Sequence, residues 1–192
     1  MDNNFNITQN DAEILLQVSR KTLEKYIRSG EKINFDHPLT DGLKQTAGMF
    51  VTLHKKERLR GCIGYIIGQE PIWKEVLELT VSSAVKDPRF PPVTPLELDE
   101  IEIEISILTP PEKISDVEEI KMGQHGVIVK RGSRQGVFLP QVAQETLWNR
   151  DTFLSELCSQ KAGLPPNAWK DKDTELFIFS AIIFNESNKT LK

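Results

Sequence analysis

The sequence predicts an α+β fold of two lobes, built from a duplicated unit of hairpin, helix and strand, with mainly antiparallel sheet. Residues 101–107 alternate apolar and polar side chains, which is the pattern of a strand with one buried face. Residues 49–66 and 126–139 each contain two short strand-like runs around a polar turn, which predicts two β-hairpins. At 192 residues, the chain is long enough for one core in two lobes.

The first half begins with an amphipathic helix. Apolar residues recur at helical spacing after Asp11, and Gly30 is placed to end the helix. Its apolar face is defined by Ala12, Leu16, Leu23 and Ile27. The first hairpin follows, and a second helix begins at Pro71 and leads to the strand at 101–107.

The second half repeats this order. After the hairpin at 126–139, a helix presents an apolar face and ends near Gly163. That face contains Phe153, Leu154, Leu157 and Cys158. Residues 176–184 are apolar throughout and rich in Phe and Ile, so they are predicted to form a short strand buried on both faces.

Hairpin, helix and strand therefore occur twice in the same order, although the two halves do not align well enough to prove a repeat. We predict one domain over residues 1–192 with two subdomains, approximately 1–110 and 111–192. A duplication of this kind places a cleft between the halves, where ligand sites commonly lie.

Charge and composition argue against several function classes. The 28 acidic and 24 basic residues are mixed along the chain and give a net charge of -4, so no nucleic-acid surface is expected. Neither a signal sequence nor a membrane span can be drawn, which predicts a cytoplasmic protein without membrane contact. The spacing of His and Cys fits no metal site, and both cysteines are predicted to be reduced thiols.

The segment Arg60-Gly61-Cys62-Ile63-Gly64 is the strongest candidate for chemistry. Alternate side chains of a strand point the same way, so Arg60 and Cys62 are predicted to share a face, where a guanidinium favours the thiolate. Gly61 and Gly64 would let a ligand or another backbone approach closely. A catalytic thiol and a small buried hydrophobic residue are both open interpretations of Cys62.

An anion site is an alternative hypothesis for the same region. The segment 68–70 leads into the helix that begins near Pro71, and free N–H groups at a helix start can bind an anion. Arg60 and Arg89 would add positive charge. Glu70 argues against a strongly anionic ligand, because it lies next to the helix start.

Two further segments could contribute to a site. His125 follows Gly123 and Gln124 in a predicted turn, which either presents the imidazole as a proton carrier or lets it hydrogen-bond its own backbone. In residues 87–92, three prolines hold Asp87, Arg89 and an aromatic ring in a stiff loop. This loop suits a binding wall and a plain helix stop about equally well.

Five motifs, in this order and spacing, resemble the AMMECR domain family, whose prokaryotic members are called AmmeMemoRadiSam system protein A. They are Leu59-Arg60-Gly61-Cys62-Ile63-Gly64, Asp87-Pro88-Arg89-Phe90-Pro91-Pro92, Gly123-Gln124-His125-Gly126, Phe138-Leu139-Pro140-Gln141-Val142-Ala143 and Lys161-Ala162-Gly163-Leu164. The resemblance extends from about Ala12 to Glu186. It implies an α+β fold with two subdomains and an internal duplication.

The resemblance also implies site positions and partners, but no established enzymatic activity. The family's motif positions in this sequence are Arg60, Gly61, Cys62, Gly64, Asp87, Arg89, Phe90, His125, Gln141 and Glu186. The family name implies association with a Memo-type protein of dioxygenase-like fold and with a radical SAM protein. Neither the resemblance nor the residues specify a cofactor.

Two function hypotheses follow. In the first, the protein is an enzyme that acts on a small molecule or a protein side chain in the cleft, with Cys62, His125 and Asp87 as catalytic residues. In the second, it is a non-catalytic binding or adaptor domain for an anionic ligand or for a Memo-type or radical SAM partner. The ligand contacts would be Arg60, Gly61, Gly64, Arg89, Phe90, Gln141 and Glu186. A third hypothesis is that the motifs only shape the fold.

Overall fold

The computed structural model describes residues 5–187 of the chain. These residues form two compact units, one of residues 5–109 and 182–187 (unit 1) and one of residues 110–181 (unit 2). Each unit has its own four-stranded sheet and its own apolar core. The predicted fold class, α+β with mainly antiparallel sheet, is confirmed.

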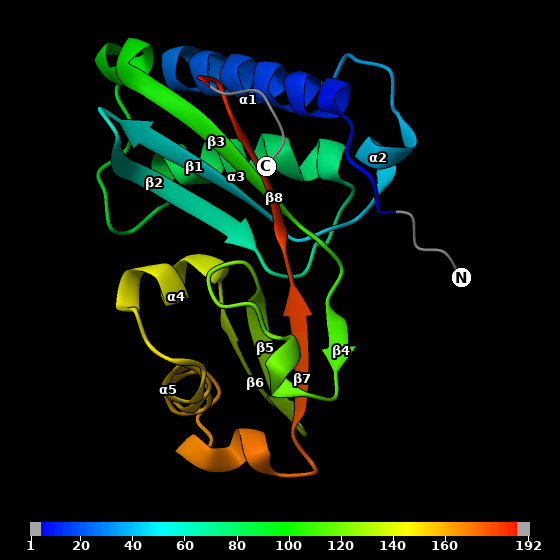
Figure 1. Cartoon of the computed structure of the whole chain (residues 1–192). Coiled ribbons are helices and arrows are strands. Elements are labelled where there is room, and N and C mark those ends of the chain that lie inside the picture. The colour runs from blue at the N-terminus through cyan, green and yellow to red at the C-terminus, as the bar shows by residue number, and fades with distance from the viewer. Residues whose placement is uncertain (1–4, 188–192) are drawn as a thin grey trace. The chain divides into compact units, whose positions relative to one another are not determined.

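Unit 1 contains a sheet in the order β2-β1-β3-β8, with α1 and α3 packed against one face (Figure 1). Its elements are α1 (Gln9–Ser29), α2 (Asp41–Lys44), β1 (Met49–Lys55), β2 (Arg58–Tyr65), α3 (Ile72–Val85), the 3₁₀ helix η1 (Pro95–Glu100), β3 (Ile101–Leu108) and β8 (Ala181–Asn185).

Unit 2 contains a sheet in the order β4-β7-β5-β6. Its elements are β4 (Glu112–Ile114), the 3₁₀ helix η2 (Val117–Glu119), β5 (Gly126–Arg131), β6 (Arg134–Phe138), α4 (Pro140–Thr146), α5 (Arg150–Glu156), the π-helical segment η3 (Leu157–Lys161), the 3₁₀ helix η4 (Pro166–Lys170) and β7 (Glu175–Phe179).

The duplication predicted from the order of elements is visible in the topology. In each sheet the first hairpin strand lies between its hairpin partner and the strand that follows the helix, giving β2-β1-β3 and β6-β5-β7. The fourth strand differs, because β8 comes last in the chain whereas β4 precedes its hairpin. The repeat is therefore one of topology.

Local sequence signals explain the ends of α1. Thr8 and Asp11 form a capping box, in which each side chain accepts the other residue's backbone N–H. Gly30 ends the helix in the left-handed conformation, at φ 74°. The predicted terminator at Gly30 is confirmed.

The alternation in β3 places one face of the unit 1 sheet in the core. Ile101, Ile103, Ile105 and Ile107 are at most 5% exposed, and they lie on the face covered by α1 and α3. On the other face, Glu104 and Cys62 both pair with Thr52 of the central strand β1. This second face carries the polar groups of the candidate site.

Residues 176–184 were predicted to form one strand buried on both faces, and this is wrong. They form β7 in the sheet of unit 2 and β8 in the sheet of unit 1, with Ser180 between them. Leu176 and Phe179 are buried in unit 2 and Phe184 in unit 1, whereas the residues between them are partly exposed. The run is apolar except at Ser180 because it contributes side chains to two cores in succession.

Candidate functional site

Cys62 lies in β2 on the sheet face opposite the unit 1 helices, and it is partly exposed. The register pairs it with Thr52 of β1, whose hydroxyl donates a hydrogen bond to the Cys62 sulfur at 3.3 Å. The second cysteine, Cys158, is fully buried in the core of unit 2, and burial raises the pKa of its thiol. The two thiols therefore differ in exposure and surroundings.

Asp87 fixes the backbone of Cys62. Its side chain is 2% exposed, and its Oδ2 accepts the Cys62 N–H at 2.8 Å. Arg89 donates to both oxygens of Asp87, from Nε at 2.9 Å and from Nη2 at 2.7 Å. These guanidinium hydrogen bonds hold the pKa of Asp87 far below its usual range, so Asp87 stays ionised at neutral pH.

Arg89 brings positive charge to the same strand. Besides binding Asp87, its Nη2 donates to the Cys62 carbonyl oxygen at 3.1 Å. Its guanidinium lies 5.5 Å from the ring centroid of Phe90. The predicted stiff loop is therefore attached to β2 through both the N–H and the carbonyl of Cys62.

Arg60 is predicted to be the cation beside Cys62, whereas the guanidinium that hydrogen-bonds to Cys62 in the structure is that of Arg89. Leu53 pairs with Gly61 and His54 with Leu59, so Arg60 is an extra residue in a β-bulge that breaks the simple alternation. Its guanidinium instead binds Glu97, from Nε at 2.9 Å and from Nη2 at 3.1 Å.

The loop beside the bulge completes the surroundings of Arg60. Its guanidinium also donates to the carbonyls of Pro91 and Pro92. The hydrogen bonds from Arg60 hold the pKa of Glu97 far below its usual range, and the Arg60 side chain is 12% exposed. Arg60 is thus engaged by groups of the protein itself.

Both glycines of the β2 motif are explained by close approaches within unit 1. A Cβ on Gly61 would lie 2.1 Å from the carbonyl oxygen of Ser83 in α3. A Cβ on Gly64 would lie 2.2 Å from the Met49 carbonyl oxygen and 2.4 Å from the Phe50 ring. Of the two interpretations, ligand or backbone approach, the second accounts for both positions.

Protein groups also occupy the predicted anion position before α3. The N–H groups of Gln69 and Glu70 donate to Oε1 of Glu75, at 2.8 and 3.3 Å. The N–H of Ile72 donates to the Gln45 carbonyl oxygen at 2.9 Å. A carboxylate of the chain itself thus takes the place expected for an anion.

His125 and Gln141 lie in unit 2. The N–H of His125 donates to the Lys121 carbonyl oxygen at 2.9 Å, and its Nδ1 accepts the Lys121 N–H at 3.3 Å. These contacts match one of the two interpretations of His125, that of a turn residue that hydrogen-bonds the local backbone. In Gln141, Oε1 is buried and has no hydrogen-bond partner among residues 5–187. That either residue meets Cys62 in a cleft stays a prediction.

Glu186 joins three elements of unit 1. Its two oxygens bind the Arg20 guanidinium of α1, and Oε2 also accepts the Ile103 N–H of β3 at 2.8 Å. The hydrogen bonds that Arg20 donates to Glu186 raise the pKa of Arg20. These contacts account for Glu186 as a structural residue.

Three partners of the site were not predicted from the sequence. Thr52 became predictable only with the hairpin register, and Ser83, which donates to the Val51 carbonyl oxygen and accepts the Ile63 N–H, depends on how α3 packs. Glu97 had a local signal, since it forms a capping box with Thr94 at the start of η1.

Among residues 5–187, no three or more His, Cys, Asp or Glu side chains are grouped so that they could hold a metal ion. Within the same residues, no helix combines the length and apolar character needed to cross a membrane. The arrangement in unit 1 is a partly exposed cysteine whose thiol accepts a hydroxyl, on a strand whose backbone is held by an ionised carboxylate and a guanidinium.

Residues 16–184 match the AMMECR1 family. Protein MK0488 of Methanopyrus kandleri is 43% identical over 189 residues, which cover 94% of this chain and 90% of that protein. A protein of Methanothermobacter thermautotrophicus is 41% identical over 187 residues, covering 94% and 96% of the two chains. The crystal structure of the uncharacterized protein PH0010 from Pyrococcus horikoshii is similar with a TM-score of 0.80, at 38% identity and 97% coverage of each chain.

Proposed function

Because this chain belongs to the AMMECR1 family, as its motifs predicted, and the names of its relatives state no activity, we propose a function from its own geometry. The protein is a thiol-dependent enzyme in which Cys62 attacks an electrophilic carbon of a small molecule or a protein side chain. The observation that carries this proposal is the setting of the partly exposed residue Cys62. Its sulfur accepts the Thr52 hydroxyl, and its backbone carbonyl accepts the Arg89 guanidinium.

Each of these residues has a role in the proposed step. The Cys62 thiol gives its proton to water, its sulfur forms a bond to the electrophilic carbon, and the leaving group departs with the bonding electrons. Thr52 donates to the sulfur, and Arg89 donates to the Cys62 carbonyl oxygen and so fixes the strand that carries the thiol. Asp87, whose pKa is held low by the Arg89 hydrogen bonds, positions Arg89 and the strand as an ionised carboxylate.

Alkylation with iodoacetamide tests the thiol directly, because Cys158 serves as an internal control. At pH 7 we expect Cys62 to be alkylated at least about tenfold faster than Cys158, whose thiol is buried and has a raised pKa. Thr52→Val and Arg89→Gln should each slow Cys62, whereas Arg60→Gln should not. Equally slow alkylation of both cysteines in the folded protein would remove the proposal.

A chromogenic ester tests turnover. With p-nitrophenyl acetate, we expect the Cys62 sulfur to take the acetyl group and release nitrophenolate, after which water hydrolyses the thioester. Cys62→Ala should abolish this release, and Cys158→Ala should retain it if that variant folds. Release at the same rate from Cys62→Ala would contradict catalysis through this thiol.

A binding or adaptor domain is the second candidate function. The contacts of Asp87 favour this second function. Both oxygens of its carboxylate accept hydrogen bonds and the group carries no proton, so it acts as an ion-pair partner and does not supply the acid that an enzyme needs. Capture of a Memo-type or radical SAM partner should then survive Cys62→Ser and weaken with Arg89→Ala. If Cys62→Ser alone abolishes the protein's activity, the enzyme is the better account.

A further inference from the structure

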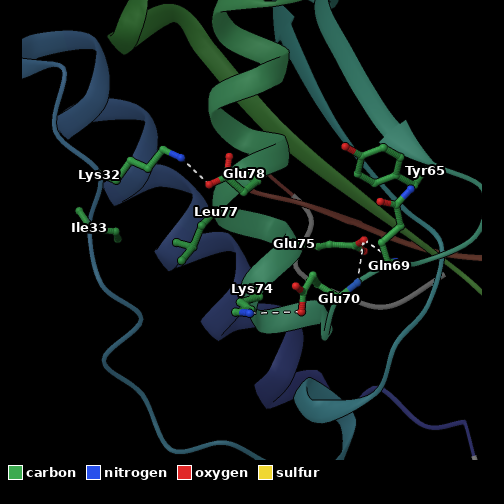
Figure 2. A pocket seen from close by; sticks show the side chains of 9 residues that line it. All are labelled: Lys32, Ile33, Tyr65, Gln69, Glu70, Lys74, Glu75, Leu77 and Glu78. Atoms are coloured by element: carbon green, nitrogen blue, oxygen red, sulfur yellow. Dashed lines mark hydrogen bonds and ion pairs between the residues drawn. The ribbon is translucent and has the colours of Figure 1, made fainter.

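A pocket lies in unit 1. It has a volume of about 340 Å³ and is formed by three parts of the chain: the segment after α1, the end of β2 with the loop that follows it, and the first turns of α3. Its size is at the lower end of the range for small-molecule pockets. Figure 2 shows its lining side chains, which come from these three parts of the chain.

The carboxylate of Glu75 lines this pocket with one oxygen unpaired. Glu75 is 4% exposed, and its Oε1 accepts the N–H groups of Gln69 and Glu70. Its Oε2 is buried and has no hydrogen-bond partner among the described residues. In Figure 2 the carboxylate extends from α3 toward Gln69, on the side of the helix where Tyr65 lies. A buried carboxylate oxygen in this state is a strong acceptor for a charged donor.

The charges of the pocket select the sign of the ligand. Lys74 pairs with Glu70 at 3.2 Å, and Lys32 pairs with Glu78. Both lysines of the lining thus have a carboxylate of their own, which leaves Glu75 as the uncompensated charge of the lining. An anion would be repelled, whereas a cation would complete the charge balance.

Part of the remaining wall is apolar. Ile33 and Leu77 line the pocket on one side of α3, and the ring of Tyr65, which is 42% exposed, lies on the side of the Glu75 carboxylate (Figure 2). We propose that this pocket binds a small organic cation, a primary ammonium group on a short alkyl chain, with Glu75 Oε2 as the acceptor. The ammonium supplies N–H donors to the carboxylate, and the alkyl chain lies along the ring of Tyr65.

An NMR titration with n-pentylamine tests this inference. Glu75, the proposed partner of the ligand, accepts hydrogen bonds from the backbone amides of Gln69 and Glu70, and the signals of these amides report binding. At pH 7 we expect saturable shifts of the Gln69 and Glu70 amide signals, and no comparable effect from 1-pentanol or pentanoate. Glu75→Gln keeps an acceptor for these amides but removes the charge, so it should weaken binding at least about tenfold.

Glu78→Gln is the matched control, since it removes an equal charge that already has Lys32 as its partner. It should change the affinity less than about threefold. Tyr65→Lys places a cation on the side of α3 where the Glu75 carboxylate lies, so it should abolish the shifts even if Glu75→Gln fails to fold. Non-saturable shifts, equal binding of pentanoate, or full affinity in either Glu75→Gln or Tyr65→Lys would overturn the inference.

Discussion

At the scale of single residues, Asp87 has the largest structural role in the candidate site. It is buried, it accepts the Cys62 N–H, and it holds the Arg89 side chain in place. Asp87→Asn removes the charge and one acceptor, so we expect the free energy of unfolding to fall by about 2–3 kcal/mol. Urea unfolding measures this loss.

The control for Asp87 is Asp41→Asn, because the Asp41 side chain is fully exposed. We expect it to change stability by less than about 0.5 kcal/mol. Comparable effects of the two substitutions would show that Asp87 does not organise this part of unit 1.

The low pKa values of Asp87 and Glu97 predict acid sensitivity. Both carboxyls have a lower pKa in the folded protein than in the unfolded chain, because guanidinium hydrogen bonds favour their ionised forms. Their stabilisation is therefore present above the ordinary carboxyl pKa of about 4 and is lost as pH falls further. Unfolding by urea should show stability decreasing between about pH 5 and about pH 3, with a shallower slope in Asp87→Asn. An unchanged slope in that variant would contradict the assignment.

The residues of this site were partly predictable from sequence. The motifs indicated that Cys62, Asp87 and Arg89 belong to one site, and the structure brings these three together. The partner of Arg60 was not predictable from alternation, because a β-bulge depends on pairing between two strands. Contacts of Thr52 and Ser83 depend likewise on register and on helix packing.

At the scale of elements, the contact between β2 and α3 depends on Gly61. Its missing side chain lets the Ser83 carbonyl of α3 lie against the strand. Gly61→Ala should therefore push the two elements apart and lower the free energy of unfolding by about 1–3 kcal/mol or more. Thermal or urea unfolding would measure the change.

Gly132→Ala separates crowding from backbone conformation. Gly132 has φ +59°, and a Cβ there would meet nothing within 4 Å. Only the left-handed conformation is penalised, which costs about 1 kcal/mol. A larger loss in Gly132→Ala than in Gly61→Ala would show that strand and helix can adjust to the added methyl group.

Most elements were predictable because their signals are local. The alternation of β3, the cap at Gly30 and both hairpins come from residues close in sequence. The division of residues 176–184 was not predictable, because an apolar run does not show which core each side chain enters.

At the scale of the whole molecule, the last described strand belongs to the first unit. Phe184 of β8 is 1% exposed in the core of unit 1, and Leu176 of β7 is 7% exposed in the core of unit 2. Phe184→Ala should cost about 3–5 kcal/mol and accelerate amide hydrogen exchange most in β1 and β3. Hydrogen exchange followed by mass spectrometry would locate the change.

Leu176→Ala is the control from the adjacent strand. It should cost about 2–5 kcal/mol and accelerate exchange most in β5 and β7. If both substitutions accelerated exchange in the same strands, the assignment of β7 and β8 to separate cores would not hold.

The position of β8 has a consequence for synthesis on the ribosome. The strands of unit 2 are synthesised before β8. Until β8 is made, the edge of β3 that pairs with it therefore stays unpaired, although the other strands of its sheet are complete. An edge strand rich in isoleucine invites pairing with other nascent chains during that interval. Slow translation of the last codons would lengthen this exposure, and a chaperone that shields β3 would shorten it.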